Sequence, residues 1–172
     1  MKLLTFILLT ISTRGARKSE LSHELREAKI KIDLPNESWF LADRQENRGM
    51  TIYYFKREPI EDSEGRQIIP NMSVIVEGVS KDLDAVTYSL LKRSKANFEV
   101  LEVYTPDGGQ IEFKNAVGYK GKYTDQGGLD HTIYVVHGIN GKKGLQFICD
   151  VTTNILDQVE SEFLVTLKSI RK

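Results

Sequence analysis

The sequence has few of the residues from which reactive centres are built. A single cysteine, Cys149, rules out a disulfide within the chain. Three histidines leave little material for a metal site or a catalytic base. The 24 basic and 24 acidic side chains cancel, so no net charge draws the chain to nucleic acid or to an anionic membrane. These shortages favour a protein that works without a metal, a cofactor or nucleic acid.

Residues that break helices and strands are also scarce, since the 172 residues include only four prolines and 13 glycines. With 40% hydrophobic and 28% charged residues, the composition excludes a collagen-like chain and a mainly disordered one. The length suits a single domain that buries a sizeable core.

The first 15 residues resemble a secretory signal peptide. A short basic start leads into a mostly apolar run at residues 3–11, and Thr13 and Gly15 are small residues placed for cleavage before Ala16. The run is too short to cross a bilayer, which needs about 20 apolar residues in a helix, so we expect no integral membrane span. Basic residues directly after the run oppose export: Arg14, Arg17 and Lys18. We predict a secreted or periplasmic protein, with a cytoplasmic one whose N-terminal element is buried as the alternative.

The rest of the chain is predicted to form a charged neck and one domain. Residues 16–27 are dense in charge and predict a short solvated helix or a flexible neck. Residues 28–172 contain no internal repeat, low-complexity tract or second domain. Alternating or β-prone residues predict strands at 28–34, 50–56, 72–79, 98–104, 110–114, 116–124, 130–137 and 143–151. Asn140 and Gly141 predict a hairpin between the last two strands.

Two amphipathic helices are expected to cover the resulting sheet. Residues 82–94 carry a stripe at helical spacing that we expect to be buried on the sheet: Leu83, Val86, Thr87, Leu90 and Leu91. The C-terminal helix carries a longer stripe: Ile155, Leu156, Val159, Phe163, Leu167 and Ile170. Hairpin-linked strands give an antiparallel sheet, so the predicted fold class is α+β.

This layout carries a recognisable pattern. Leu34 and Pro35 followed by Trp39 form an L-P-x-x-x-W motif, a strand pair leads into the helix at 82–94, and three hairpin strands run into the final helix. Over residues 28–171 the chain resembles the PsbP/Mog superfamily, which includes DcrB-like periplasmic proteins. The resemblance implies an antiparallel sheet of about six to seven strands flanked by helices, an α/β/α sandwich. It also implies an accessory or assembly factor without enzyme activity, and it transfers no functional residue.

The reactive side chains do not predict a catalytic or metal centre. His131 and His137 share a strand on which six residues span about 20 Å, too far to hold one metal ion. Cys149 alternates with apolar residues, which predicts a buried thiol rather than a nucleophile. Lys120 and Lys122 lie on the strand face opposite the neighbouring tyrosines, an arrangement that does not favour nucleic acid binding. We predict no catalytic residue, no metal and no cofactor.

Aromatic side chains provide the candidate partner surface, formed by Trp39, Tyr53, Tyr54 and Phe55. Such residues usually belong to the core or cover the sheet, but a group that stays exposed together would bind a partner. The sequence thus predicts a non-enzymatic, exported binding or assembly factor with a protein partner. The alternatives are a cytosolic regulatory module that binds a folded protein, and a small-ligand carrier with a pocket between sheet and helix.

Overall fold

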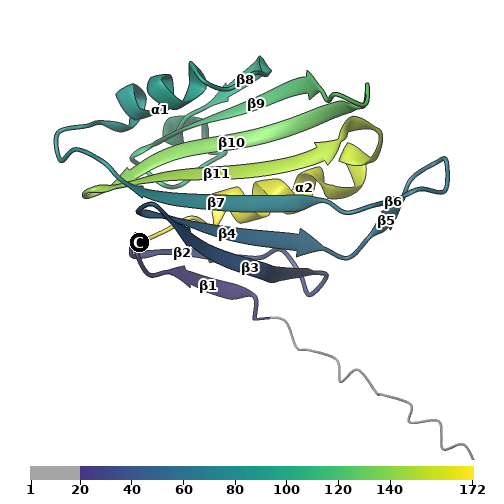
Figure 1. Ribbon diagram of the computed structural model, residues 1–172, viewed down its shortest axis with the longest axis horizontal. Helices are drawn as coiled ribbons and strands as arrows, with labels where there is room; N and C mark the ends of the chain where they lie inside the picture. The colour runs from purple at the N-terminus through teal and green to yellow at the C-terminus, as the bar shows by residue number, and fades with distance from the viewer. Residues whose placement is uncertain (1–19) are drawn as a thin grey trace, which may run out of the picture.

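The computed structural model describes residues 20–172, and its centre is a seven-stranded antiparallel sheet (Figure 1). The strands and helices are β3 (Trp39–Asn47), β4 (Met50–Arg57), β7 (Asn71–Gly78), α1 (Ala85–Arg93), β8 (Glu99–Tyr104), β9 (Ala116–Thr124), β10 (Asp130–Asn140), β11 (Lys143–Thr152) and α2 (Leu156–Lys168). The strand order is β3-β4-β7-β11-β10-β9-β8. The predicted α+β fold with six to seven antiparallel strands is confirmed. The predicted signal peptide lies outside the described residues.

Short elements complete the fold. Two small hairpins pair β1 (Ser22–Leu25) with β2 (Ile30–Asp33), and β5 (Ile60–Glu61) with β6 (Gln67–Ile68). Single 3-10 turns form at Pro106–Gly108 and Thr153–Ile155. The second of these turns leads directly into α2.

The two helices cover opposite faces of the sheet. α2 packs on β10, β11 and β2, whereas α1 packs on β9 and β10. Tyr134 of β10 contacts Phe163 of α2. His137, three residues further along the same strand, forms a hydrogen bond with Ser89 of α1. Because successive strand residues point to opposite faces, these contacts place the sheet between the helices in an α/β/α sandwich.

The main hydrophobic core lies between the sheet and α2. The stripe predicted for α2 is buried there, except that Leu156 is only partly buried. Side chains from central strands complete this core: Phe55, Val74, Tyr134 and Phe147. Trp39, at the start of β3, packs on Phe163 with ring centroids 5.8 Å apart. One continuous core therefore joins the sheet, α2 and the β1–β2 hairpin.

The described part of the charged segment at residues 16–27 includes a strand, not a helix or a flexible neck. β1 pairs with β2, and Leu25 lies opposite Ile30. Leu25 is fully buried in the main core, although most of its neighbours in the segment are exposed. Burial of this one apolar side chain anchors a strand whose charged residues face solvent. The ordered domain therefore begins before residue 28.

Two further segments differ from the sequence prediction. β3 is a strand that the pattern does not predict, because beyond Trp39 its side chains are mostly exposed at the edge of the sheet. Residues 110–114 do not form the predicted strand. Ile111 and Phe113 are nevertheless buried, and Gly138 makes room for Phe113, since a Cβ there would lie 2.9 Å from the ring. The alternating apolar residues at 110–114 are therefore buried by a segment that has no regular secondary structure.

Candidate functional site

α1 is held on the sheet by polar contacts as well as by packing. Its buried residues are Ala85, Tyr88 and Ser89. The Tyr88 ring lies over Gly144 of β11, where a Cβ would come within 2.7 Å of the ring. The Tyr88 hydroxyl donates a hydrogen bond of 2.6 Å to Glu77, whose carboxylate also pairs with Lys92. These contacts decide which side of α1 faces the sheet.

Most of the stripe predicted to be buried in residues 82–94 consequently faces solvent, and only Leu83 is partly buried. Val86 is 58% exposed, Leu90 61% and Leu91 53%. The expectation that these side chains pack on the sheet is wrong, because Tyr88 and Ser89 occupy that side of the helix. The Tyr88 hydroxyl reaches Glu77 of β7, and the Ser89 hydroxyl reaches Tyr119 of β9 and His137 of β10, so both side chains are satisfied on the side that faces the sheet.

Ser89 belongs to a buried polar network beneath α1. Its hydroxyl lies 3.0 Å from Nδ1 of His137 and 2.7 Å from the hydroxyl of Tyr119. Burial, with a smaller contribution from the charge of Lys92, lowers the pKa of His137 to about 4. Ser89 is 1% exposed and His137 2%, so this serine and imidazole are both buried between α1 and the sheet. The network anchors α1.

An apolar groove lies where the C-terminal end of α1 and the segment after it meet the sheet. Its volume is about 240 Å³. It is lined by Lys92, Ala96, Asn97, Phe98, Tyr123, Ile133, Val135, His137, Gln146 and Ile148. Ile133 of β10 and Ile148 of β11 line it and are only partly buried. The groove therefore offers aliphatic surface that no other described element covers completely.

Phe98 lines the groove and is fixed from two sides. Arg93 of α1 donates hydrogen bonds to the backbone carbonyls of Ala96 and Phe98, and its guanidinium lies 4.2 Å from the centroid of the Phe98 ring. The ring also lies against Gly121 of β9, where a Cβ would come within 2.3 Å of it. This side of the groove is therefore preformed.

The groove continues onto a part of the sheet that α1 does not cover. In the strand register Ile148 lies beside Ser73, and Ser73 lies beside Tyr54. Ile75 pairs with Ile52 in the same way. All five side chains are partly exposed, and Figure 1 shows α1 towards the β8 edge of the sheet. On β7, α1 contacts Glu77 through Tyr88 and Lys92. We call this surface the open face; it comprises the groove together with Ile52, Tyr54, Ser73 and Ile75.

Polar side chains gather beside the groove at Tyr123. Asp150 accepts hydrogen bonds from the Tyr123 hydroxyl, at 2.6 Å, and from Nδ1 of His131, at 2.8 Å. The rings of Tyr123 and His131 stack with centroids 4.8 Å apart. Burial, and then the hydrogen bond to Asp150, raise the pKa of Tyr123, so its hydroxyl stays a donor. Within residues 20–172, no group of three or more His, Cys, Asp or Glu side chains is arranged to hold a metal ion.

The structure separates the four aromatic residues predicted as a partner surface. Trp39, Tyr53 and Phe55 are 0%, 5% and 1% exposed and belong to the main core. Tyr54 points to the other face of the sheet, is partly exposed and forms part of the open face. The prediction of a joint surface is wrong for the three buried residues, because alternation along β4 sends Tyr53 and Phe55 towards α2.

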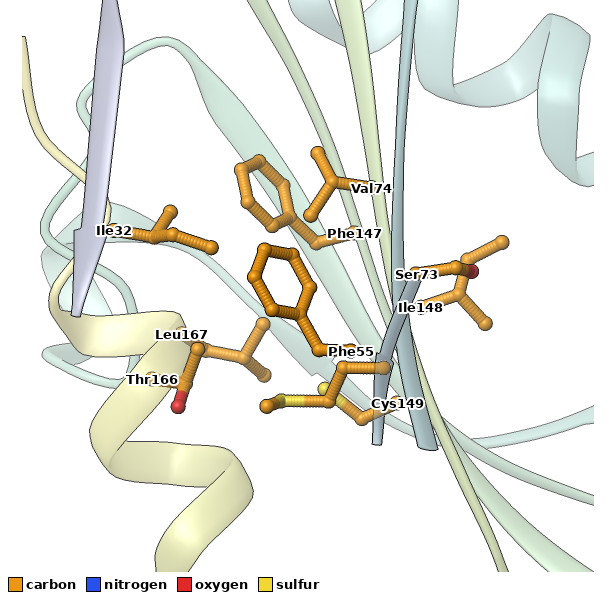
Figure 2. Close-up of a pocket in the computed structure, with 10 residues that line it drawn as sticks. Ile32, Phe55, Ser73, Val74, Phe147, Ile148, Cys149, Thr166 and Leu167 are labelled. Carbon is orange, nitrogen blue, oxygen red and sulfur yellow. The ribbon is translucent and has the colours of Figure 1, made fainter. Parts of the chain in front are cut away.

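The core on the α2 side has no room for a ligand. Figure 2 shows Ile32 of β2, Leu167 of α2, and Phe55 and Phe147 of the sheet around the cavity there. Its volume is about 10 Å³, enough for about one water molecule. Cys149 borders the same cavity and is 2% exposed, and burial raises the pKa of its thiol. The predicted burial of Cys149 is confirmed, and a ligand pocket between the sheet and α2 is not supported.

The residues that line the groove were not predicted as a site. One signal for them is present in β10 and β11, where apolar residues occupy both strand faces: Ile133 and Val135 alternate with Tyr134 and Val136. Such strands have apolar surface on both sides of the sheet. The second apolar face shows that something packs there, but the sequence alone does not show that α1 leaves part of it open.

Comparison with solved structures identifies the architecture. The chain superposes on cyanobacterial PsbP (CyanoP) from Synechocystis sp. PCC 6803 with a TM-score of 0.54 and 16% identity, over 95% of this chain and 98% of that one. The chain has a PsbP-like fold. The resemblance to the PsbP/Mog superfamily is thus confirmed at the level of fold. Neither a family model nor a curated protein sequence matches the chain.

Two other solved structures are similar to this chain. The Ran-binding protein Mog1p of Saccharomyces cerevisiae has a TM-score of 0.49 and 14% identity, over 87% of this chain and 93% of that one. A protein from Bacteroides thetaiotaomicron has a TM-score of 0.49 and 8% identity. The match covers 90% of this chain, which spans only 48% of the Bacteroides protein.

Neither α1 nor α2 has the length and hydrophobicity that a bilayer crossing by a helix demands, and residues 20–172 contain no other α-helix.

Proposed function

We propose that this PsbP-like protein is a non-enzymatic binding or accessory protein that holds a protein partner on its open face. The observation that carries the proposal is the groove, an apolar hollow with one preformed side at Phe98. Partly exposed side chains continue the surface from the groove across β7 and β4. Exposed apolar surface of this kind marks interaction sites, and binding energy concentrates where an anchor side chain fills a hollow.

The dimensions of the groove favour a side chain of a protein partner over a small free ligand. Small-molecule pockets typically have volumes of about 300–1,000 Å³ and enclose most of the ligand. The groove measures about 240 Å³, and it adjoins the rest of the open face. An aliphatic or aromatic side chain of a partner would fill it, while the surrounding surface of that partner covers Ile75 and Tyr54.

The polar groups around the groove support binding rather than turnover. The Ser89 hydroxyl is enclosed by His137 and Tyr119 beneath α1. Asp150 is already engaged by Tyr123 and an imidazole. A nucleophile needs a base beside it and an approach for the substrate, and this arrangement supplies no accessible pair.

Photo-crosslinking in the native host tests the proposal. A photoreactive amino acid is placed at Ala96, which lines the groove, and in a matched protein at Val165, which is 54% exposed on α2. We expect a reproducible cross-link from position 96 to a different protein and none from position 165. The further change Ile148→Gln should reduce this cross-linking about tenfold, because a buried aliphatic contact is lost. Equal products at both positions, or attachment to a small molecule alone, would contradict the proposal.

We also propose that the chain is exported and that residues 1–15 are removed. The basic start and the apolar run support this, and cleavage before Ala16 would leave β1 intact. Intact-mass measurement of protein isolated from its native host should show the loss of the first 15 residues. A mass that retains Met1 and the apolar run would contradict export and favour a cytosolic regulatory module.

A further inference from the structure

α1 has apolar side chains on two sides. The sheet covers one of these sides and leaves the other exposed. Ala85 and Tyr88 pack on the sheet, while the opposite side presents three side chains that are each more than half exposed: Val86, Leu90 and Leu91. We call these three residues the α1 ridge. A helix that is apolar beyond a single stripe is normally buried on more than one side. The ridge is therefore surface that a second molecule would cover.

The charges at the two ends of the ridge are of opposite sign. Lys81, Asp82 and Asp84 precede α1 and Lys95 follows it, and all four are exposed. The N-terminal end therefore has a net negative charge, in spite of Lys81, and the C-terminal end a positive one. The other charged groups of the helix are engaged: Asp84 caps the N-terminus, Lys92 is in an ion pair, and Arg93 binds backbone carbonyls. Among residues 20–172, Asp82 and Lys95 form no ion pair. They are available to a second molecule.

We propose that α1 of a second copy of this chain lies antiparallel on the α1 ridge, related by a two-fold axis near the middle of the helix. In this arrangement Val86 faces Leu91 of the second copy, and Thr87 faces Leu90. Asp82 at one end faces Lys95 at the other. The two-fold axis repeats each contact, so the interface is closed and the assembly stops at a dimer.

Charge complementarity singles out a second copy in this orientation. A parallel pair would place Asp82 beside Asp82 and Lys95 beside Lys95, which is repulsive at both ends. The antiparallel pair replaces both repulsions by attractions and keeps the aliphatic side chains together at the centre. Packed helices lie about 8–10 Å apart, a spacing that side chains of this size fill. The contact uses none of the residues that line the groove, so it stands independently of the proposed function.

Sedimentation equilibrium of the purified full chain tests the dimer. We expect the average mass to rise from that of one chain to twice that value as the concentration increases to about 100 μM, since a micromolar dimer is largely formed there. Leu90→Gln with Leu91→Gln should raise the dissociation constant at least about tenfold, because aliphatic contacts are lost twice in the dimer. Val165→Gln, a matched change at an exposed apolar residue of α2, should leave it unchanged.

Charge exchange gives a second, independent measurement. Asp82→Lys and Lys95→Glu should each weaken the dimer, and the two changes together in one chain should restore it, because the attraction is re-formed with its sign reversed. Circular dichroism confirms that each variant is folded. A chain that stays monomeric at every concentration overturns the proposal. So does a dimer that the α1 changes do not weaken, or one that the double charge change does not restore.

Discussion

Replacing Trp39 with alanine is expected to lower the free energy of unfolding by about 3–5 kcal/mol, the range typical for a large aromatic residue removed from a core. Trp39 is 0% exposed and packs on Phe163 of α2. Its indole Nε1 donates a hydrogen bond of 2.7 Å to Glu162. The change would leave a cavity between β3 and α2 and would also remove a donor from a partly buried carboxylate.

The contacts of Glu162 explain why Trp39→Ala should lower the free energy of unfolding through lost hydrogen bonding as well as through lost packing. Its carboxylate also accepts hydrogen bonds from Arg57, at 2.9 Å, and from Asn36, at 2.8 Å. Burial alone would raise the pKa of Glu162, but the hydrogen bonds from Arg57, Trp39 and Asn36 lower it overall. The indole is therefore one of three donors that keep this carboxylate ionised where β3, β4 and α2 meet.

Urea denaturation of the Trp39→Ala protein measures the effect directly. Phe40→Ala is the matched control, because Phe40 is the next residue and is 42% exposed; its cost should stay within about 0.5 kcal/mol. Trp39→Phe should fall between the two, since it keeps an aromatic ring but loses the donor. For a domain of this size the Tm of Trp39→Ala should drop by at least about 6 °C. A cost for Trp39→Ala no larger than that for Phe40→Ala would show that Trp39 does not stabilise the packing of β3 on α2.

The strands that the sequence predicts best are those in which the alternation of apolar and polar residues matches the burial of the two strand faces. β9 has the predicted bounds, and β10 and β11 meet at the predicted hairpin, where Asn140 pairs with Lys143 and Gly141 takes a positive φ of 60°. A period of two along a half-buried strand, with a turn residue suited to the left-handed region, leaves little alternative. The α2 stripe succeeds for the same reason, because the whole stripe faces one core.

The failures occur where position in the fold, not local pattern, decides burial. β3 lies at the edge of the sheet, so its charged residues are exposed on both sides and no alternation marks it. In α1 the periodicity identifies a real apolar stripe, but Tyr88 and Ser89 find partners on β7, β9 and β10 that are remote in sequence. Spacing along one helix carries no information about such partners.

The open face shows the same limit for the site. Phe98 reaches the groove because Gly121 admits its ring and Arg93 holds the backbone beside it. Each of these residues is unremarkable in the sequence, and only the packing of α1 against β9 brings them together. In β4 the reverse occurs, because residues that are contiguous in the sequence are separated by the fold. Tyr53 and Phe55 lie on one face of the sheet and Tyr54 lies on the other. Neighbouring positions in the sequence therefore predicted an aromatic surface that does not form, and they gave no sign of the groove at Phe98.

The buried imidazole of His137 is expected to make the protein less stable as the pH falls from about 6.5 towards 4. The ordinary pKa of a histidine is 6.5, and burial together with the charge of Lys92 lowers that of His137 to about 4, although the charge of Glu77 acts in the opposite direction. Below pH 6.5 the unfolded chain takes up a proton that the folded chain refuses, so the free energy of unfolding decreases. The stability that depends on the neutral imidazole is complete above pH 6.5 and is lost by about pH 4. The full loss is about 3 kcal/mol, of which about 2 kcal/mol falls between pH 7 and pH 5.

Urea denaturation at pH 7, 6 and 5 of the unsubstituted protein and of His137→Gln separates this contribution from others. The carboxylates with lowered pKa, such as Glu27, lose their contribution only below their ordinary pKa of about 4.5, so the range down to pH 5 isolates the histidines. The variant starts from a lower stability, because the hydrogen bond to Ser89 is altered, but its dependence on pH should be clearly shallower, with the remaining slope due to His23. Burial also lowers the pKa of His23, so His23→Gln is the matched control and should keep most of the slope. An unchanged slope in His137→Gln would show that this imidazole is not the group that couples protonation to folding.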